Sequence, residues 1–103
     1  MQAKFIFAAA LAAAISGTAL ADGAKLFQEK TCWSCHGKDA KTPILPAYPK
    51  IAGQNKAYIE QQMRDIKSGA RANGNTAAMK GIMVIVDDAD IPQLADYLSK
   101  LKP

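Results

Sequence analysis

Cys32-Trp33-Ser34-Cys35-His36 is the stretch that decides the fold of this 103-residue chain, and it holds the only two cysteines and the only histidine. In a helix, cysteines three residues apart lie on one face, and here a histidine follows them directly. Two cysteines exclude a framework of several disulfides. Two thiols and one imidazole are one ligand short of a zinc site, and the βαβ pattern of a thioredoxin-like cysteine pair is missing.

The pattern Cys-x-x-Cys-His is typical of covalent haem attachment. Cysteines at this spacing can reach two vinyl groups of one haem, and the histidine can then place an imidazole nitrogen on the iron. We therefore predict one haem c, with Cys32 and Cys35 as the thioether positions and His36 as an axial ligand. Such a group would also stabilise a chain that is short for a single hydrophobic core.

The first 21 residues have the pattern of a secretory signal peptide. A lysine precedes the apolar run Phe5 to Ile15, and Ala19-Leu20-Ala21 offers the small residues that signal peptidase needs. We predict cleavage after Ala21, which leaves one domain over residues 22–103, soluble in the periplasm and without stable membrane insertion. The alternative is that Phe5 to Ala21 stays attached as an anchor helix, although this run is at the short edge of what crosses a bilayer.

The charge of the chain is mildly positive, with 13 Lys and Arg against 9 Asp and Glu. The basic residues are scattered from Lys25 to Lys102 and form no stripe, which argues against a nucleic-acid partner. Asp87, Asp88 and Asp90 form an acidic cluster. The scatter indicates either an ordinary solvated surface or a loose ring of lysines that steers an acidic partner.

Apolar periodicity predicts an all-α fold with three main helices and long loops. The first helix is expected from about Asp22 to Cys35. The second begins near Asn55 and ends at Gly69, and the third begins at Asp88 or Asp90. We expect an irregular, proline-containing loop over residues 41–53, a polar loop over 70–76 and an extended segment over 81–86.

A second axial ligand has to come from a methionine, because the chain has no other histidine. Met1 leaves with the signal peptide, and Met63 belongs to the apolar stripe of the second helix. Met79 follows a polar loop, and Gly81 would let the backbone turn close to a flat ring. Met83 stands among aliphatic residues, where a core role is natural. Local chemistry favours Met79 and leaves Met83 as the alternative.

Several short motifs in this order resemble a known family. They are CWSCH at 32–36, PKIAGQ at 49–54, Tyr58 with Gln62, GAR at 69–71, MKG at 79–81 and a DxDI turn at 88–91. Together they resemble a class I c-type cytochrome, and within it one domain of the bacterial dihaem cytochromes of the c-four subclass. In that family the axial methionine stands nine residues before the aspartate that opens the last helix. Nine residues before Asp88 is Met79.

The resemblance also implies roles for residues around the haem. A proline carbonyl after the haem motif would accept the Nδ1 proton of the axial histidine, and Pro46 fits this role best, with Pro43 as the alternative. Tyr48 and Arg71 would hydrogen-bond near the haem propionates. The first helix would cross the last one, so that Gly23 and Phe27 meet three of its residues, namely Leu94, Tyr97 and Leu98.

A haem iron held by histidine and methionine has no open position for a substrate, so the resemblance implies an electron carrier and not an enzyme. Its partners would be a donor dehydrogenase or membrane complex and an acceptor oxidase or reductase. The alternative is a cytochrome subunit of a periplasmic dehydrogenase complex, for which the aliphatic segment 82–86 is a hint. An enzyme or gas sensor would require Met79 to dissociate readily. The single CxxCH motif indicates a monohaem protein, either a carrier by itself or one that pairs with another subunit.

Overall fold

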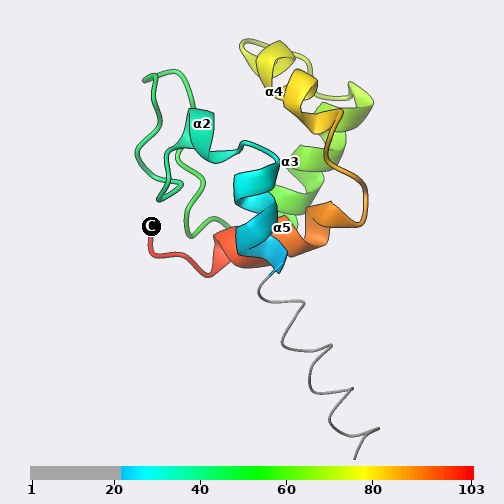
Figure 1. Cartoon of the computed structure of the whole chain (residues 1–103). Coiled ribbons are helices and arrows are strands. Elements are labelled where there is room, and N and C mark those ends of the chain that lie inside the picture. Colours follow the sequence, from blue (N-terminus) through cyan, green and yellow to red (C-terminus); the bar gives the residue numbers. More distant parts are fainter. Residues whose placement is uncertain (1–21) are drawn as a thin grey trace, which may run out of the picture.

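The structure, a computed structural model, describes residues 22–103, and within them it contains helices and turns but no strand (Figure 1). Residues 22–29 are helical, followed by α2 (Trp33–His36), α3 (Lys56–Ser68), α4 (Thr76–Met83) and α5 (Asp90–Ser99). The predicted all-α class is confirmed. No helix within 22–103 has the length and hydropathy to cross a membrane. The predicted cleavage after Ala21 and its anchor alternative lie outside the described residues.

The predicted first helix is interrupted before the cysteines. Residues 22–29 are helical, and Thr31 then adopts a left-handed conformation with a φ of 61°. L-residues adopt this region rarely, so the helix cannot continue through Thr31. The chain resumes as the single turn α2, in which the His36 amide donates to the Cys32 carbonyl at 3.0 Å. A continuous helix over 22–35 is therefore wrong, but the two cysteines do lie on one helical turn.

Helix α3 begins and ends where the sequence predicts. The Asn55 side chain accepts a hydrogen bond of 3.1 Å from the Tyr58 amide and so caps the first turn. Gly69 ends the helix in the left-handed region, with a φ of 90°, and its amide donates to carbonyls of the last turn. The helix buries one stripe, made of Ile59, Met63 and Ile66.

Helix α4 replaces the first half of the extended segment expected over residues 81–86. The helix runs from Thr76 to Met83, and residues 84–86 are turns. Burial follows this geometry, because Met83 and Val86 are buried whereas Val84 is 76% exposed. In a strand, burial would instead recur at every second residue. The expectation of an extended segment is therefore wrong.

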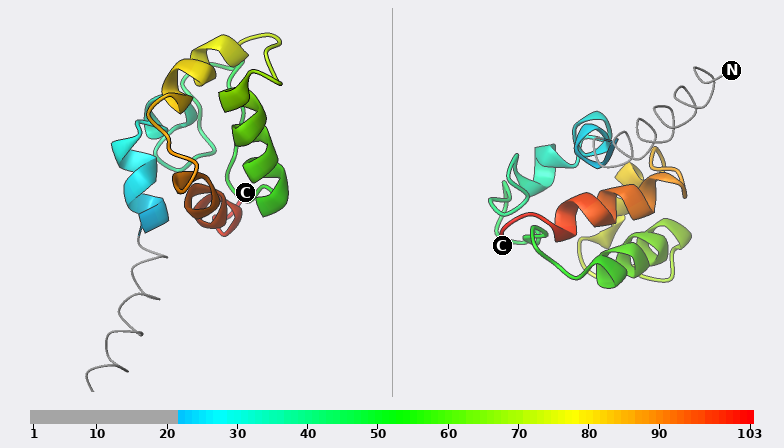
Figure 2. Two further views of the ribbon diagram at one scale, coloured as in Figure 1. Left: turned by 90° about the vertical axis from the view of Figure 1, so that its right-hand side faces the viewer. Right: turned by 90° about the horizontal axis from the view of Figure 1, so that it is seen from below.

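The helical segment 22–29 crosses α5, as expected (Figure 2). A Cβ atom on Gly23 would lie 2.6 Å from the Gln93 carbonyl oxygen and 2.6 Å from the Tyr97 Cβ, so glycine is required for this close approach. The rings of Phe27 and Tyr97 are in contact, with centroids 5.8 Å apart. Leu94 lies among the fully buried residues of this core, and the other such residues with large side chains are Met83, Val86 and Ile91.

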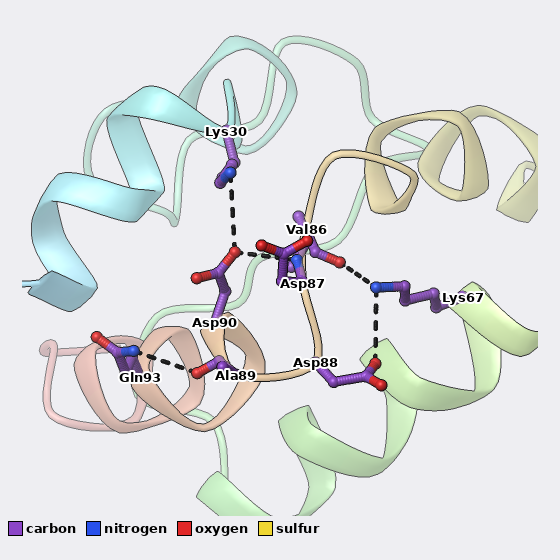
Figure 3. A network of polar contacts seen from close by, with 8 residues as sticks. All are labelled: Lys30, Lys67, Val86, Asp87, Asp88, Ala89, Asp90 and Gln93. Carbon is purple, nitrogen blue, oxygen red and sulfur yellow. Dashed lines mark hydrogen bonds and ion pairs between the residues drawn. The ribbon is translucent and has the colours of Figure 1, made fainter.

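The loop between α4 and α5 is tied to two other elements (Figure 3). Lys67 of α3 donates from Nζ to the Val86 carbonyl oxygen and lies 3.6 Å from the Asp88 carboxylate. On the other side, Lys30 lies 3.8 Å from the carboxylate of Asp90, the first residue of α5. These contacts hold the end of α4 and the start of α5 in a fixed relation to the rest of the fold.

Candidate functional site

The candidate site is a cavity of about 410 Å³ that collects residues far apart in the sequence. Its lining includes Cys32, Cys35 and His36 from the motif and Met79 from α4. Much of the remaining wall is aliphatic and comes from the loop before α3, from α3 itself, from α4 and from α5, with Ile51, Ile59, Ile66, Ile82, Leu94 and Leu98. A large apolar cavity with a few convergent polar groups is typical of a cofactor site.

The two cysteines are free thiols, partly buried, in the lining of this cavity. Burial raises the pKa of the Cys32 thiol to about 11, with a backbone hydrogen bond opposing this and the neighbouring Cys35 adding to it. A thiol with this pKa is protonated at neutral pH and is a poor nucleophile or metal ligand. The environment therefore does not suit a redox-active cysteine pair.

The imidazole of His36 is 7% exposed and is oriented by one main-chain hydrogen bond. Its Nδ1 lies 2.9 Å from the carbonyl oxygen of Pro49. A carbonyl oxygen only accepts, so Nδ1 carries the proton and Nε2 keeps its lone pair for a metal. The acceptor predicted from the sequence was Pro46, with Pro43 as the alternative, and both assignments are wrong.

The path of the loop explains why Pro49 is the acceptor. The Ile44 amide donates to the Cys35 carbonyl at 3.0 Å, and a turn follows in which the Tyr48 amide donates to the Leu45 carbonyl at 3.1 Å. Residue 46 lies inside this turn and outside the cavity lining, whereas Pro49 comes after the turn and lines the cavity. The motif PKIAGQ itself begins with this proline, so the signal was present in the sequence.

Three methionines are described by the structure, and two of them line the cavity. Met79 reaches it from α4, partly buried, and Met63 contributes to its wall from α3. Met83 is 0% exposed and packs into the core away from the lining. Gly81 lies within α4 and is exposed, and a Cβ there would meet no heavy atom within 4 Å. The argument that a turn at Gly81 brings the backbone close to a ring is therefore wrong.

Tyr48 and Arg71, the two residues expected near the propionates, both line the cavity. The Arg71 Nη1 donates to the Gln62 Oε1 at 3.1 Å, and its amide donates to the Asp65 carbonyl at 3.0 Å. Sequence reasoning assigned no role in the site to several other polar residues of the lining, which are Gln54, Tyr58, Gln62, Asn73, Asn75 and Thr76. Three of these six residues, Gln54, Tyr58 and Gln62, belong to motifs that carried the family resemblance.

The lining fits a haem. It offers two thiols one helical turn apart, an imidazole with a free Nε2, a thioether on another helix and aliphatic walls for a flat macrocycle. Within residues 22–103 no group of three or more His, Cys, Asp or Glu side chains could hold a metal ion by itself. Thr76 adds a buried hydroxyl with no hydrogen-bond partner among the described residues.

Known proteins resemble this chain along most of its length. A cytochrome c4 from Pseudomonas aeruginosa is 38% identical over 71 residues, which are 69% of this chain and 33% of that protein. A protein from Thiomonas intermedia named thiosulfate dehydrogenase electron acceptor is 37% identical over 73 residues, 71% of this chain and 32% of that one. The chain thus spans about a third of the length of these relatives.

A solved structure, reduced cytochrome c4 from Pseudomonas stutzeri, superimposes with a TM-score of 0.72 at 30% identity. The match covers 84% of this chain and 50% of that one, and it confirms the class I cytochrome c fold. The model of the family described as cytochrome c matches residues 20–102. With that match over most of its length, the chain belongs to the cytochrome c family, whose members bind haem c covalently and transfer electrons.

Proposed function

We propose that this protein carries single electrons between redox partner proteins in the periplasm, with one haem c attached through Cys32 and Cys35 and ligated by His36 and Met79. The observation that supports this most is that all four side chains line one cavity, although three come from α2 and its N-cap residue and the fourth comes from α4. Met83, the alternative ligand, packs in the core and would have to leave it to reach the cavity.

The protein's own groups explain how such a site favours electron transfer. The Pro49 carbonyl holds the Nδ1 proton of His36, which orients the ring and makes Nε2 a stronger ligand. The aliphatic walls would keep water from a bound haem, and His36 and Met79 would both be taken up by its iron, which would leave a substrate no position there. When bound, the haem supplies an iron that changes valence, and a methionine thioether favours the ferrous state and raises the potential.

We assign Tyr48 and Arg71 to the propionates of the haem. The guanidinium of Arg71 is held at the cavity by its hydrogen bond to Gln62 and keeps further N–H groups for a carboxylate. Tyr48 also lines the cavity, in the segment that leads to Pro49. Both residues would neutralise or solvate carboxylates at the edge of an apolar site.

Steering of an acidic partner follows from the lysines around the motif. Lys38, Lys41 and Lys50 are exposed and form no ion pair with any described residue. Lys50 is also part of the cavity lining. Unpaired positive charge beside the haem would raise the encounter rate with an acidic redox partner, an effect that salt screens.

The covalent attachment is tested by acid–acetone extraction of the holoprotein, produced with the haem-attachment machinery. We expect the haem to stay with the denatured polypeptide, and we expect the variant Cys32→Ser to keep it through a single thioether in a less stable protein. Cys32→Ser with Cys35→Ser is the control and should lose all haem to the organic phase. Haem that leaves the unaltered protein in this phase would contradict the proposal.

A second candidate function is that of a cytochrome subunit in a dehydrogenase complex. Val84 and Ile85 are adjacent aliphatic side chains, 76% and 47% exposed, at the end of α4. One relative carries the name thiosulfate dehydrogenase electron acceptor. Gentle purification of the native protein distinguishes the two functions, because a subunit would co-purify with its dehydrogenase and a carrier would elute alone.

A further inference from the structure

Thr76 carries a buried polar group that none of the roles above uses. It is the first residue of α4, is 5% exposed and contributes to the cavity lining. Its hydroxyl oxygen is covered by protein atoms and has no hydrogen-bond partner among the described residues. A buried hydroxyl without a partner destabilises a fold. Valine at this position would therefore give a more stable protein, unless the holoprotein supplies an acceptor for the hydroxyl.

A candidate acceptor on the same helix is Met79. The two residues are three positions apart on α4 and both line the cavity. Residues at this spacing share a helix face, and long side chains in a helix lean back toward its N-terminus, so a Met79 side chain that binds iron can approach the turn that begins at Thr76. The protein without haem has no hydrogen bond between the two side chains. A thioether sulfur that binds a metal keeps a second lone pair, which can accept a weak hydrogen bond.

A propionate is a less suitable acceptor for this hydroxyl. The Thr76 Oγ1 is covered even though a cavity of about 410 Å³ opens beside the residue, so a carboxylate in the cavity would not reach it directly. Tyr48 and Arg71 already offer donors for carboxylates at the cavity. A sulfur carried by a neighbouring side chain of the same helix needs no such access.

We propose that the Thr76 hydroxyl donates a hydrogen bond to the Met79 sulfur and so positions that sulfur as the axial ligand, an inference that rests on the ligand set of the proposed function. The hydrogen bond withdraws electron density from the sulfur. Ferric iron depends more on that density than ferrous iron does, so the hydrogen bond raises the reduction potential. Thr76 is thus a positioning residue that also tunes the haem.

The test compares the holoproteins Thr76→Val and Thr76→Ser with the unaltered protein. Valine keeps the shape and removes the donor, and serine keeps the donor. We expect Thr76→Val to lower the midpoint potential, shift the far-red methionine-to-ferric-iron band and bind imidazole on ferric iron about twofold to tenfold more tightly. Thr76→Ser should restore all three values. Ala77→Ser adds a hydroxyl on the exposed side of α4 and is the control.

The outcomes separate this inference from the proposed function. If the unaltered protein lacks the far-red band, methionine ligation is wrong and the inference falls with it. If the band is present and Thr76→Val changes neither potential nor imidazole affinity but raises the unfolding temperature, the hydroxyl has no partner and only the inference is overturned. If the potential falls while the methionine signals stay unchanged, the acceptor is another group, which also overturns it. Should Thr76→Val yield no holoprotein, Thr76→Ala takes its place against Thr76→Ser.

Discussion

At His36, a single hydrogen bond decides which ring nitrogen is available to iron. The Nδ1–H donates to the Pro49 carbonyl over 2.9 Å, so only Nε2 can act as a ligand. Met79 is positioned by α4 and by packing against the core, and the hydrogen bond that we propose for its sulfur comes from the Thr76 side chain. The two proposed axial positions therefore differ in how they are held, and single substitutions can separate them.

Met79→Ala is expected to abolish the far-red band of the ferric holoprotein and the upfield-shifted methionine methyl signal of the ferrous one. The substitution removes the thioether, so the potential should fall and carbon monoxide should bind to the ferrous protein. Met83→Ala is the matched control from the same helix. It should keep both signals and destabilise the fold by about 2–5 kcal/mol, because Met83 is fully buried.

The reverse behaviour of the two variants would make Met83 the ligand and would require α4 to rotate. If neither variant loses the band, the ligand is Met63, the other methionine that lines the cavity. Either result would remove the present support for the ligand set while leaving the covalent attachment untouched.

Asp39 stabilises the turn after the haem motif and makes this part of the fold sensitive to acid. Its carboxylate accepts hydrogen bonds from the Lys41 amide at 3.0 Å, the Thr42 amide at 2.9 Å and the Thr42 hydroxyl at 2.8 Å. The bond from the Lys41 amide, followed by that from the Thr42 hydroxyl, holds the pKa of Asp39 below its usual value.

A carboxylate whose pKa is lowered in the folded state stabilises the fold above its unfolded pKa of about 3.9 and loses this effect as the pH falls through the folded value. We therefore expect Asp39→Asn to lower the unfolding temperature at pH 7. At a pH below the folded pKa of Asp39, the variant and the unaltered protein should unfold at the same temperature. Thermal unfolding followed by circular dichroism across this range measures the difference. Lys38→Gln, an exposed neighbour, should show no such pH dependence.

At the scale of elements, α4 is the helix that sequence reasoning missed, and its glycine is the cause. Gly81 in the run GIMVIV was expected to allow a turn and to begin an extended segment, yet it lies inside the helix. Gly69 differs, because it ends α3 in the left-handed region, with a φ of 90°. We therefore expect replacement by alanine to change the stability of the fold in opposite directions at these two glycines.

Gly81→Ala is expected to stabilise the protein by about 0.5–1 kcal/mol, because alanine loses less backbone entropy in a helix and its Cβ meets no heavy atom within 4 Å. Gly69→Ala should destabilise it, because alanine is strained at that φ. Denaturant unfolding of the two holoproteins gives both values. Destabilisation by Gly81→Ala with a changed haem spectrum would instead place Gly81 against the haem.

The crossing of segment 22–29 over α5 depends on Gly23. A Cβ there would lie 2.6 Å from main-chain and side-chain atoms of α5, so Gly23→Ala must move the two helices apart. We expect a loss of about 1–3 kcal/mol in the free energy of unfolding. Ala24→Ser, at an exposed position of the same segment, should change it little. Equal stabilities of the two variants would show that the crossing is loose.

At the scale of the whole molecule, the feature that bears most on stability is the cavity of about 410 Å³, which is lined by residues of α3, α4 and α5 and by the haem motif. A void of this size in a small domain removes many of the contacts that stabilise a core. Folding is therefore expected to require the haem. The double variant Cys32→Ala with Cys35→Ala, made without haem, should show weak helical circular dichroism and rapid proteolysis. A cooperative unfolding transition in this apoprotein would contradict the expectation.

The parts of the fold that local chemistry determines were predictable from the sequence. The ends of α3 follow from the cap at Asn55 and the left-handed Gly69, and the haem motif follows from its own spacing. The break at Thr31 was not predictable, because threonine does not favour a positive φ. The choice of Pro49 over Pro46 likewise depends on a turn whose register only the folded loop defines.

The hydrogen bond from His36 to Pro49 affects which substitutions such a protein can accept during evolution. Its acceptor is a main-chain oxygen, which every amino acid carries, so point mutations at residue 49 alter the path of the loop but never delete the acceptor. The opposite face of the proposed site is built from side chains, Met79 with Thr76 beside it, and each can be exchanged by one codon change. Point mutations therefore act unequally on the two axial ligands. The hydrogen bond to His36 keeps its acceptor whatever residue stands at position 49, whereas the groups around Met79 that would tune the potential can each be lost by one substitution.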